Sequence, residues 1–484
     1  MPHILTIDQS TSATKAVLFD ASAPVAQAHI PHTQIHPQPG WVEHDPMEIL
    51  ANMQQVIAQV LTAAKILPGD VAALAITNQR ETVVVWDKVT GQPVYNAIVW
   101  QCSRAETLCQ EWAAHAHAVR QATGLVLSPF FSAAKVAWIL RNVPQAAEKA
   151  KAGRLAMGTV DSWLAYQLTG RHVTDCGNAS RTQLLHIATQ TWDDDMLALF
   201  GIPRSMLPEL VMSDATVGMI NTGPLQGIPL VGLLGDSHAA LLGHGCVWPG
   251  MAKASYGTGS SVVQPVDDLP DVPVLATSIA WGLEGRVRYM LEGNINCSGG
   301  TVAWLKDQLG LIGDASEAEA LAASVPDSGG VYLVPAFAGL GAPHWRSTTR
   351  AALVGMTLST TKAHVMRAAE EAIALQVADV VQAMRDAGYA PQALRVDGGG
   401  AHSDFLMTMQ SGLLCLPVER NALQELSAYG AFLAARMGLG WMKLADAGDW
   451  VRQDAVFMPD TGEEERERLC AGWRDALAMV MGQG

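Results

Sequence analysis

Three short loops combine an acidic or glycine residue with hydroxyl side chains directly after an apolar run, at residues 8–15, 256–261 and 397–403. Such turns present backbone N–H groups and hydroxyls without side-chain bulk, which suits the oxygens of a phosphate. Each loop by itself could equally be an ordinary tight turn. The P-loop and Rossmann patterns are absent from the sequence. Two hairpin loops and a later glycine turn therefore favour a nucleotide site that is divided between separate loops.

Asp236 follows the apolar run at residues 228–234 and precedes a short helical segment. One interpretation is a helix N-cap, a common role for Asp. The other is a carboxylate that accepts a proton from a hydroxyl group and helps to hold a divalent cation. Both interpretations are open at this point.

Arg80 and Glu81 come directly after the predicted strand at residues 71–77. They could form a surface ion pair of little energetic weight. They could instead offer hydrogen-bond donors and acceptors to a polyhydroxylated ligand. Trp100 and Phe130 would then supply an apolar wall beside these polar groups, although each could simply be a core residue.

The elements that must position these residues begin with a predicted hairpin of strands 3–7 and 14–19 and a third strand at 25–30. Asp45 and Pro46 have the types expected at the N-cap and first position of a helix. Further strands are predicted at residues 71–77 and 82–86.

The second half repeats this order. A new hairpin is predicted from strands 252–256 and 260–266, and a short strand at 394–396 runs into the third loop. The most regular helical pattern is predicted to begin at Ser359 as its N-cap. The sequence therefore predicts an α/β protein of two similar domains, residues 1–248 and 249–484, divided near Pro249.

Composition narrows the class of protein. The 484 residues are 49% hydrophobic and 16% charged, which excludes a disordered chain. A net charge of -15 argues against a nucleic-acid or anionic-membrane partner. The seven cysteines show no zinc spacing, and no signal peptide or membrane span is recognisable. We therefore expect reduced thiols in a cytoplasmic protein.

The ordered segments together resemble the FGGY carbohydrate kinases over nearly the whole chain, and within that family the glycerol kinases. Residues 130–139 fit the first family signature, and residues 351–371 fit the second except at Glu370. The other segments that carry the resemblance are residues 8–12, 39–46, 77–82, 98–101, 235–236, 256–259, 334–343 and 395–399.

The resemblance implies two ribonuclease-H-like domains of the actin and sugar-kinase superfamily with a cleft between them. The first would carry the acceptor site and one phosphate loop, and the second the other phosphate loop and the adenosine site. It also implies ATP and Mg²⁺, with Asp8 and Asp236 beside the metal and Asp236 as catalytic base. The residues implied at ATP are Thr11, Ser12, Lys15, Gly257, Thr258, Gly299, Gly399 and Ser403. Those implied at the acceptor are Arg80, Glu81, Trp100, Phe130, Asp236 and Ser237.

The chain departs from the glycerol kinases on both sides of this implied site. On the nucleotide side Ser10 replaces a glycine, Lys15 an arginine and Ala303 a glutamine, and Lys15 keeps the positive charge. On the acceptor side Ser237 replaces a glutamine, Phe130 a tyrosine and Ser261 an aromatic residue. We therefore expect a kinase for a polyol or ketose of three to five carbons.

Alternatives are glycerol kinase proper or a ketopentose kinase of the xylulokinase type. Two alternatives of another class are a relative that uses ATP as a conformational switch and a catalytically silent sugar sensor. The intact acids Asp8 and Asp236 and the polar pair Arg80–Glu81 argue against both. We also expect a homo-oligomer, dimer or tetramer, with a small-molecule substrate.

Overall fold

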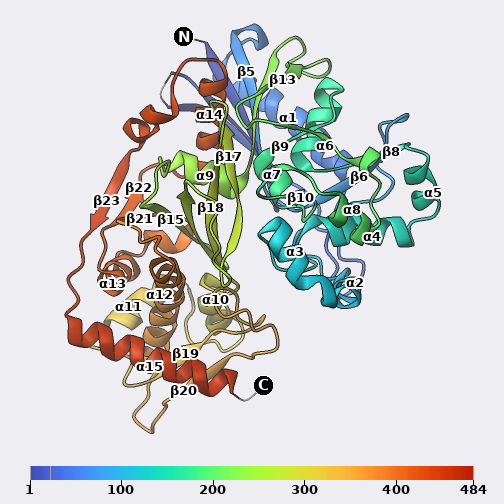
Figure 1. The fold of residues 1–484 in the computed structure, drawn as a ribbon. Coiled ribbons are helices and arrows are strands. Elements are labelled where there is room, and N and C mark those ends of the chain that lie inside the picture. The colour runs from blue at the N-terminus through green and yellow to red at the C-terminus, as the bar shows by residue number, and fades with distance from the viewer. Residues whose placement is uncertain (1, 22, 315, 483–484) are drawn as a thin grey trace. The chain divides into compact units, whose positions relative to one another are not determined.

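The computed structural model describes residues 2–21, 23–314 and 316–482 and shows a mixed α/β protein. The chain forms two compact units (Figure 1). Unit 1 comprises Met1–Val247, Thr277–Tyr289 and Glu425–Trp450, and unit 2 comprises Trp248–Ala276, Met290–Gln424 and Val451–Gly484. Thr277–Tyr289 and Glu425–Trp450 come after Pro249 in the sequence but belong to unit 1. A single division of the chain near Pro249 therefore does not describe these two units.

The main sheet of unit 1 has the strand order β13-β14-β5-β1-β2-β3. Its bounds are β1 (His3–Gln9), β2 (Ala13–Phe19), β3 (Pro24–Pro31), β5 (Val71–Asn78), β13 (Thr216–Met219) and β14 (Pro229–Gly235). The first three strands form the predicted antiparallel meander, while β5 and β14 are parallel to β1. The parallel strands are buried nearly throughout, as expected where helices cover both faces.

Helix α1 (Pro46–Ala64) begins as predicted, because Asp45 is its N-cap and accepts a hydrogen bond from Met47 N at 2.8 Å. Its residues Met53 and Ile57 are buried in the core of unit 1. Helix α14 (Leu426–Gly438) packs on β1, β5, β14 and α9 (Asp236–Gly243). Figure 1 shows this late helix in red beside the blue strands of unit 1.

A smaller sheet of unit 1 has the order β4-β7-β6-β8. It comprises β4 (Glu43–His44), β6 (Val83–Asp87), β7 (Ala97–Ile98) and β8 (Leu155–Thr159). The short strands nearby are β9 (Val173–Asp175), β10 (Leu185–His186), β11 (Thr191–Trp192) and β12 (Glu209–Val211). The helices of this region are α2 (Glu106–Glu111), α3 (Ala116–Thr123), α4 (Ser132–Asn142), α5 (Ala146–Lys151), α6 (Val160–Thr169), α7 (Cys176–Ser180) and α8 (Asp194–Phe200).

A second large sheet has the order β17-β18-β16-β15-β21-β22-β23. Its bounds are β15 (Met251–Tyr256), β16 (Ser260–Val266), β17 (Ala276–Leu283), β18 (Arg286–Ile295), β21 (Ala393–Asp397), β22 (Val418–Asn421) and β23 (Gln453–Phe457). Strands β15 and β16 form the predicted hairpin, and β21 is parallel to β15. The remaining elements of unit 2 are β19 (Tyr332–Val334), β20 (Ala352–Val354), α10 (Gly299–Asp307), α11 (Ser316–Ala323), α12 (Lys362–Asp386), α13 (Asp404–Leu414) and α15 (Glu463–Met481).

The predicted N-cap of α12 at Ser359 is wrong. Thr361 is the N-cap, and its backbone N–H donates to His364 Nδ1 at 3.1 Å. Ser359 lies in the preceding turn, where its hydroxyl contacts Thr357 Oγ1 at 2.8 Å. Ser359 and Thr361 are both of a type that suits an N-cap. Thr361 is the N-cap because it is hydrogen-bonded to His364 three residues later.

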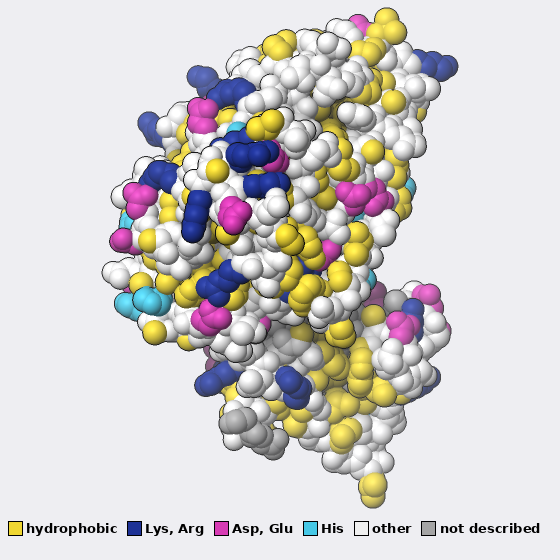
Figure 2. All heavy atoms as spheres, turned by 90° about the vertical axis from the view of Figure 1, so that its right-hand side faces the viewer, with side chains coloured by type: hydrophobic (Ala, Val, Ile, Leu, Met, Phe, Trp, Pro, Cys, Tyr) yellow, Lys and Arg dark blue, Asp and Glu magenta, His cyan; other side chains and the backbone are white. Residues whose placement is uncertain are grey.

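On the face that Figure 2 shows, acidic side chains lie among the lysines and arginines. Within the described ranges no helix combines the length and apolarity needed to cross a bilayer.

Candidate active site

Asp8 lies near the end of β1, beside Lys15 of β2 and Thr77 of β5. Its side chain is buried, and its Oδ1 has no hydrogen-bond partner among the described residues. The pKa of Asp8 is raised to about 7, chiefly by burial and then by the nearby Asp236, while Lys15 opposes the shift. A buried carboxylate with an unused oxygen beside a second acid fits a bound cation.

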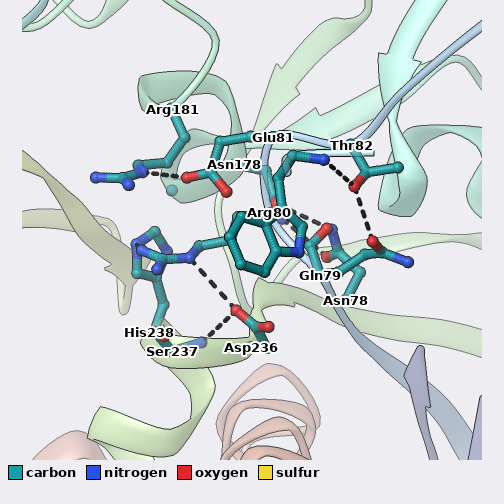
Figure 3. A network of polar contacts seen from close by, with 12 residues as sticks. Asn78, Gln79, Arg80, Glu81, Thr82, Asn178, Arg181, Asp236, Ser237 and His238 are labelled. Atoms are coloured by element: carbon teal, nitrogen blue, oxygen red, sulfur yellow. Dashed lines mark hydrogen bonds and ion pairs between the residues drawn. The ribbon is translucent and has the colours of Figure 1, made fainter. Parts of the chain in front are cut away.

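Asp236 is the first residue of α9, and Gly235 is the N-cap. The N-cap interpretation of Asp236 is therefore wrong. Its Oδ1 accepts a hydrogen bond from Ser237 N at 2.7 Å and lies 3.3 Å from Arg80 Nε (Figure 3). The side chain is 35% exposed, which leaves the carboxylate accessible to a ligand. Ser237 is half-buried beside it.

Residues 78–82, here called the acceptor turn, carry Arg80 and Glu81 between β5 and β6. Both side chains are buried, and each has its own partner: Asp236 for Arg80 and Arg181 for Glu81. The interpretation of Arg80 and Glu81 as a surface ion pair is therefore wrong. Glu81 has a left-handed backbone conformation with φ +61°.

Hydrogen bonds join the acceptor turn to the first loop. Gln79 Nε2 donates to Gln9 Oε1 at 3.0 Å. Figure 3 shows the neighbouring bond, in which Thr82 Oγ1 donates to Gln79 Oε1 at 2.8 Å. Trp100 N donates to Thr82 Oγ1 at 3.1 Å, and Trp100 Nε1 donates to Thr11 Oγ1 at 2.9 Å. A residue predicted at the acceptor, Trp100, is thus in direct contact with one predicted at ATP, Thr11.

Trp100 and Phe130 meet edge to face, with ring centroids 5.4 Å apart. Both rings are half-buried rather than enclosed in the core. The buried Lys135 donates hydrogen bonds to the carbonyls of Phe130 and Phe131, and burial lowers the pKa of Lys135 to about 7. The rings of Trp100 and Phe130 therefore form an accessible apolar surface. Lys135 holds the backbone at Phe130 and Phe131.

Lys15 pairs with a residue that the sequence did not single out. Its Nζ lies 2.8 Å from Glu425 Oε2 and 3.0 Å from Glu425 Oε1. Glu425 belongs to the segment that returns to unit 1 before α14. Ser12, next to Thr11 at the tip of the first loop, is exposed.

In unit 2, three residues predicted at the nucleotide lie together. Gly257 and Thr258 are exposed in the turn between β15 and β16. The N-terminus of α10 packs on this turn: Gly299 N donates to Gly257 O at 2.9 Å, and Ser298 N donates to Thr258 O at 2.8 Å. A Cβ on Gly299 would lie 2.7 Å from Gly257 O, so the contact requires glycine there.

The third loop packs on the same turn. Gly398 has φ +86°, and a Cβ there would lie 2.5 Å from Tyr256 O. Gly399 is exposed at the start of a short 3-10 helix, Gly399–His402. Ser403 is the N-cap of α13, and its hydroxyl accepts from Leu406 N at 3.1 Å. Its assignment near adenosine stays a prediction.

The described residues include no group of three or more His, Cys, Asp or Glu side chains that could hold a metal ion. Magnesium does not require one, because it is commonly bound by one or two carboxylates together with phosphates and water. Asp8 and Asp236 meet that requirement.

Comparison with known proteins identifies the family. Residues 3–243 match the N-terminal domain of the FGGY family of carbohydrate kinases, and residues 252–439 match its C-terminal domain. The chain belongs to the FGGY family of carbohydrate kinases. It is therefore a phosphotransferase with a hydroxyl acceptor, and ATP and Mg²⁺ are the cofactors of the family. Its fold is the two-domain sugar-kinase fold.

Individual relatives cover nearly the whole FGGY chain. A glycerol kinase of Symbiobacterium thermophilum is 47% identical over 99% of this chain and 98% of its own length. The structure of Plasmodium falciparum glycerol kinase with ADP matches with a TM-score of 0.94 and 34% identity, over 99% of this chain and 98% of that one. A ligand-bound xylulose kinase from Lactobacillus acidophilus covers 100% of both chains with a TM-score of 0.91, and its 22% identity supports the fold alone.

Sequence reasoning missed residues that contact the candidate site, among them Asn178, Arg181 and Glu425. The first two belong to a buried run of small and polar residues at 176–183. An arginine and an asparagine inside a run that lacks large apolar residues are a usable signal for a buried polar network. No local signal pointed to Glu425, whose partner Lys15 is 410 positions away.

Proposed function

We propose that this FGGY kinase transfers the γ-phosphoryl group of ATP to a hydroxyl of a small polyol or ketose, with Asp236 as general base. The observation that carries the proposal is the position of Asp236. It contacts Arg80 of the acceptor turn and raises the pKa of the buried Asp8. One accessible carboxylate thus adjoins both the proposed acceptor site and the proposed metal site.

Phosphoryl transfer requires mainly positioning and charge neutralisation from the protein. Arg80 and Glu81 would bind acceptor hydroxyls, with Ser237 beside them. Trp100 and Phe130 would pack against the carbon chain. Asp236 would take the proton from the attacking hydroxyl, a contribution of about 10²- to 10⁴-fold in rate.

Each unit carries residues that are proposed to bind the nucleotide. Thr11, Ser12 and Lys15 would bind phosphate oxygens in unit 1, and Gly257, Thr258 and Gly299 would do so in unit 2. Gly399 and Ser403 would lie near adenosine. Asp8 and Asp236 would hold Mg²⁺, whose charge would neutralise that of the phosphates.

For the acceptor we propose a four- or five-carbon polyol or ketose, with glycerol as a weaker substrate. Phe130 and Ser237 lack the longer polar reach that glycerol kinases have at these positions. Each lost hydrogen bond is worth roughly 0.5–1.5 kcal/mol, so two losses weaken glycerol binding by about one to two powers of ten. The short side chain of Ser237, which lies beside Asp236, leaves volume and a hydroxyl for a longer chain.

Glycerol kinase proper is the second candidate. It is favoured by the name of the relative that is 47% identical over 99% of this chain. At that similarity the remaining pocket residues could replace the missing contacts.

The test is an ATP-consumption screen of purified protein with Mg²⁺ against triols, tetritols, pentitols, ketoses and sugar acids. We expect the highest kcat/KM for a four- or five-carbon compound. Glycerol as the best acceptor would establish the second candidate. ATP turnover that does not depend on any acceptor would refute the kinase proposal.

We also propose a cytoplasmic homo-oligomer. Met356 and Leu358 are large apolar side chains exposed on unit 2, which favours a contact between subunits, and the cysteines of the described chain are free thiols, as expected in the cytoplasm. Light scattering checks the oligomer, since a mass of 51.4 kDa would show a monomer instead.

A further inference from the structure

The short helix α7 and the residue after it contact the acceptor turn at two places. Asn178 and Asn78 exchange amide hydrogen bonds of 3.1 Å in each direction. Arg181 Nε lies 2.6 Å from Glu81 Oε1 (Figure 3). The two donors are three residues apart, and so are their two partners. Helix α7 and the residue after it therefore hold the turn that carries Arg80 at two points.

The position of α7 is itself fixed by a buried carboxylate. Asp175 is the N-cap and accepts from Gly177 N at 3.0 Å and Asn178 N at 2.8 Å. It also accepts from the Asn178 side chain and from Ser213 Oγ, each at 2.7 Å. Because Asp175 and Asn78 together orient the Asn178 amide, its oxygen can only face Asn78.

Glu81 requires such support. A non-glycine residue at φ +61° is strained and persists only where the surroundings impose it. Ser132 Oγ donates to the backbone carbonyl of Glu81 at 3.0 Å, and Arg181 holds the side chain. The Arg181 and Glu81 side chains are 0% and 3% exposed, so the direction of the carboxylate depends on this partner rather than on water.

Arg181 also contacts the apolar side of the proposed pocket. Its guanidinium lies over the ring of Phe131, 5.2 Å from the centroid. Phe131 packs edge to face on Phe130, with centroids 5.2 Å apart. One buried cation thus contacts both the polar turn and the aromatic segment.

We infer that Arg181 and Asn178 are positioning residues of the acceptor site, acting through Glu81 and Asn78. The inference rests on the proposed function, in which Arg80 and Glu81 bind the acceptor. Arg181 sets the direction of the Glu81 carboxylate, and Asn178 sets the end of β5 from which the turn starts. Loss of either displaces acceptor-binding groups and leaves the nucleotide loops in place.

The experiment measures KM for the best polyol and KM for ATP in the full-length enzyme. Arg181→Met should raise the polyol KM by about tenfold or more and change the ATP KM by less than about twofold. Arg181→Lys, which keeps the charge without the planar fork, should recover part of the loss. Arg141→Met removes an exposed arginine from its pair with Glu111 and is the matched control, with no change expected.

A double-mutant cycle separates positioning from general damage. If Arg181 acts through Glu81, then Glu81→Gln combined with Arg181→Met should bind polyol no more weakly than Glu81→Gln alone. This pair removes both buried charges, so it also serves if Arg181→Met alone does not fold. Multiplying effects, or equal increases in both KM values, would overturn the inference.

The two proposals fail differently. If wild-type protein shows acceptor-dependent ATP use and Arg181→Met retains the wild-type polyol KM, only the positioning inference is overturned. If wild-type protein shows no acceptor-dependent ATP use, the proposed function fails and this inference fails with it.

Discussion

The two phosphate-loop hairpins share one strand pattern and differ in their chemistry. In unit 1, β1 pairs antiparallel with β2 and parallel with β5; in unit 2, β15 pairs in the same way with β16 and β21. The first strand of unit 1 carries the buried Asp8 beside Thr77. In unit 2 the first strand carries Ser255 at this position, and the acid, Asp397, lies on the neighbouring strand.

The turns of the two hairpins differ in the same sense. The first loop contains the charged residues Asp8 and Lys15, which interact electrostatically with Asp236 and Glu425. The second turn contains glycine and hydroxyl residues, and its carbonyls accept from the N-terminus of α10. The same strand pattern thus carries charged side chains at the first loop and glycine and hydroxyl residues at the second turn.

The largest expected effect tests the proposed role of Asp236 in unit 1. Asp236→Asn should reduce kcat by at least about a hundredfold, since it removes the proposed base and one metal ligand. The melting temperature should stay near the wild-type value, because Gly235 and not Asp236 is the helix N-cap. Near-normal turnover in a folded variant would contradict the assignment of chemistry to unit 1.

The next effect concerns acceptor choice, for which the two proposed residues Phe130 and Ser237 both lie in unit 1. Phe130→Tyr combined with Ser237→Gln should improve kcat/KM for glycerol by about ten- to a hundredfold and reduce it for the longer acceptor. The ATP KM should be unchanged. Steady-state kinetics with both acceptors checks this, and each single variant serves as a partial control.

A smaller effect tests the turn between β15 and β16 in unit 2. Thr258→Val should raise the KM for ATP roughly threefold to tenfold, the value of about one hydrogen bond, while acceptor binding stays measurable. Calorimetric titration with nucleotide and with polyol separates the two. An equal loss of both affinities would mean that the hairpin has been damaged instead.

The smallest effect concerns the stability of the nucleotide-free enzyme. The pKa of Asp8 in the folded protein is about 7, above its ordinary value of 3.8. The free energy of unfolding therefore falls as the pH rises from 3.8 to about 7. Asp8→Asn should therefore raise the melting temperature by a few degrees at pH 8 and hardly at all at pH 4. It should also abolish the additional stabilisation by Mg²⁺ with ATP.

The control for this prediction is Asp194→Asn, which changes a carboxylate that is 78% exposed. It should show no gain that depends on pH. A destabilising effect of Asp8→Asn at pH 8 would mean that a partner in the fold, and not a bound cation, satisfies the carboxylate.

The sequence predicted those features of the protein that local interactions determine. The hairpin β1–β2 follows from two apolar runs joined by a polar link, and α1 starts at Asp45 because an N-cap needs only its own next residues. The loops at Asp8, Gly257 and Gly398 were identified because acids, hydroxyls and glycines mark such turns by type. The cap of α12 was misplaced by two residues, since Ser359 and Thr361 differ only in which one gains His364 as a partner.

Only the tertiary structure determined which distant groups meet. Glu425 pairs with Lys15, and Arg181 with Glu81, because packing brings these chain segments together. The segment Glu425–Trp450 joins unit 1 through the close crossing of α9 and α14: a Cβ on Gly430 would lie 1.7 Å from Ala239 O. A glycine in a helical pattern gives no indication of which backbone it approaches. That depends on how buried surfaces fit across hundreds of residues, which residue type and short spacing do not encode.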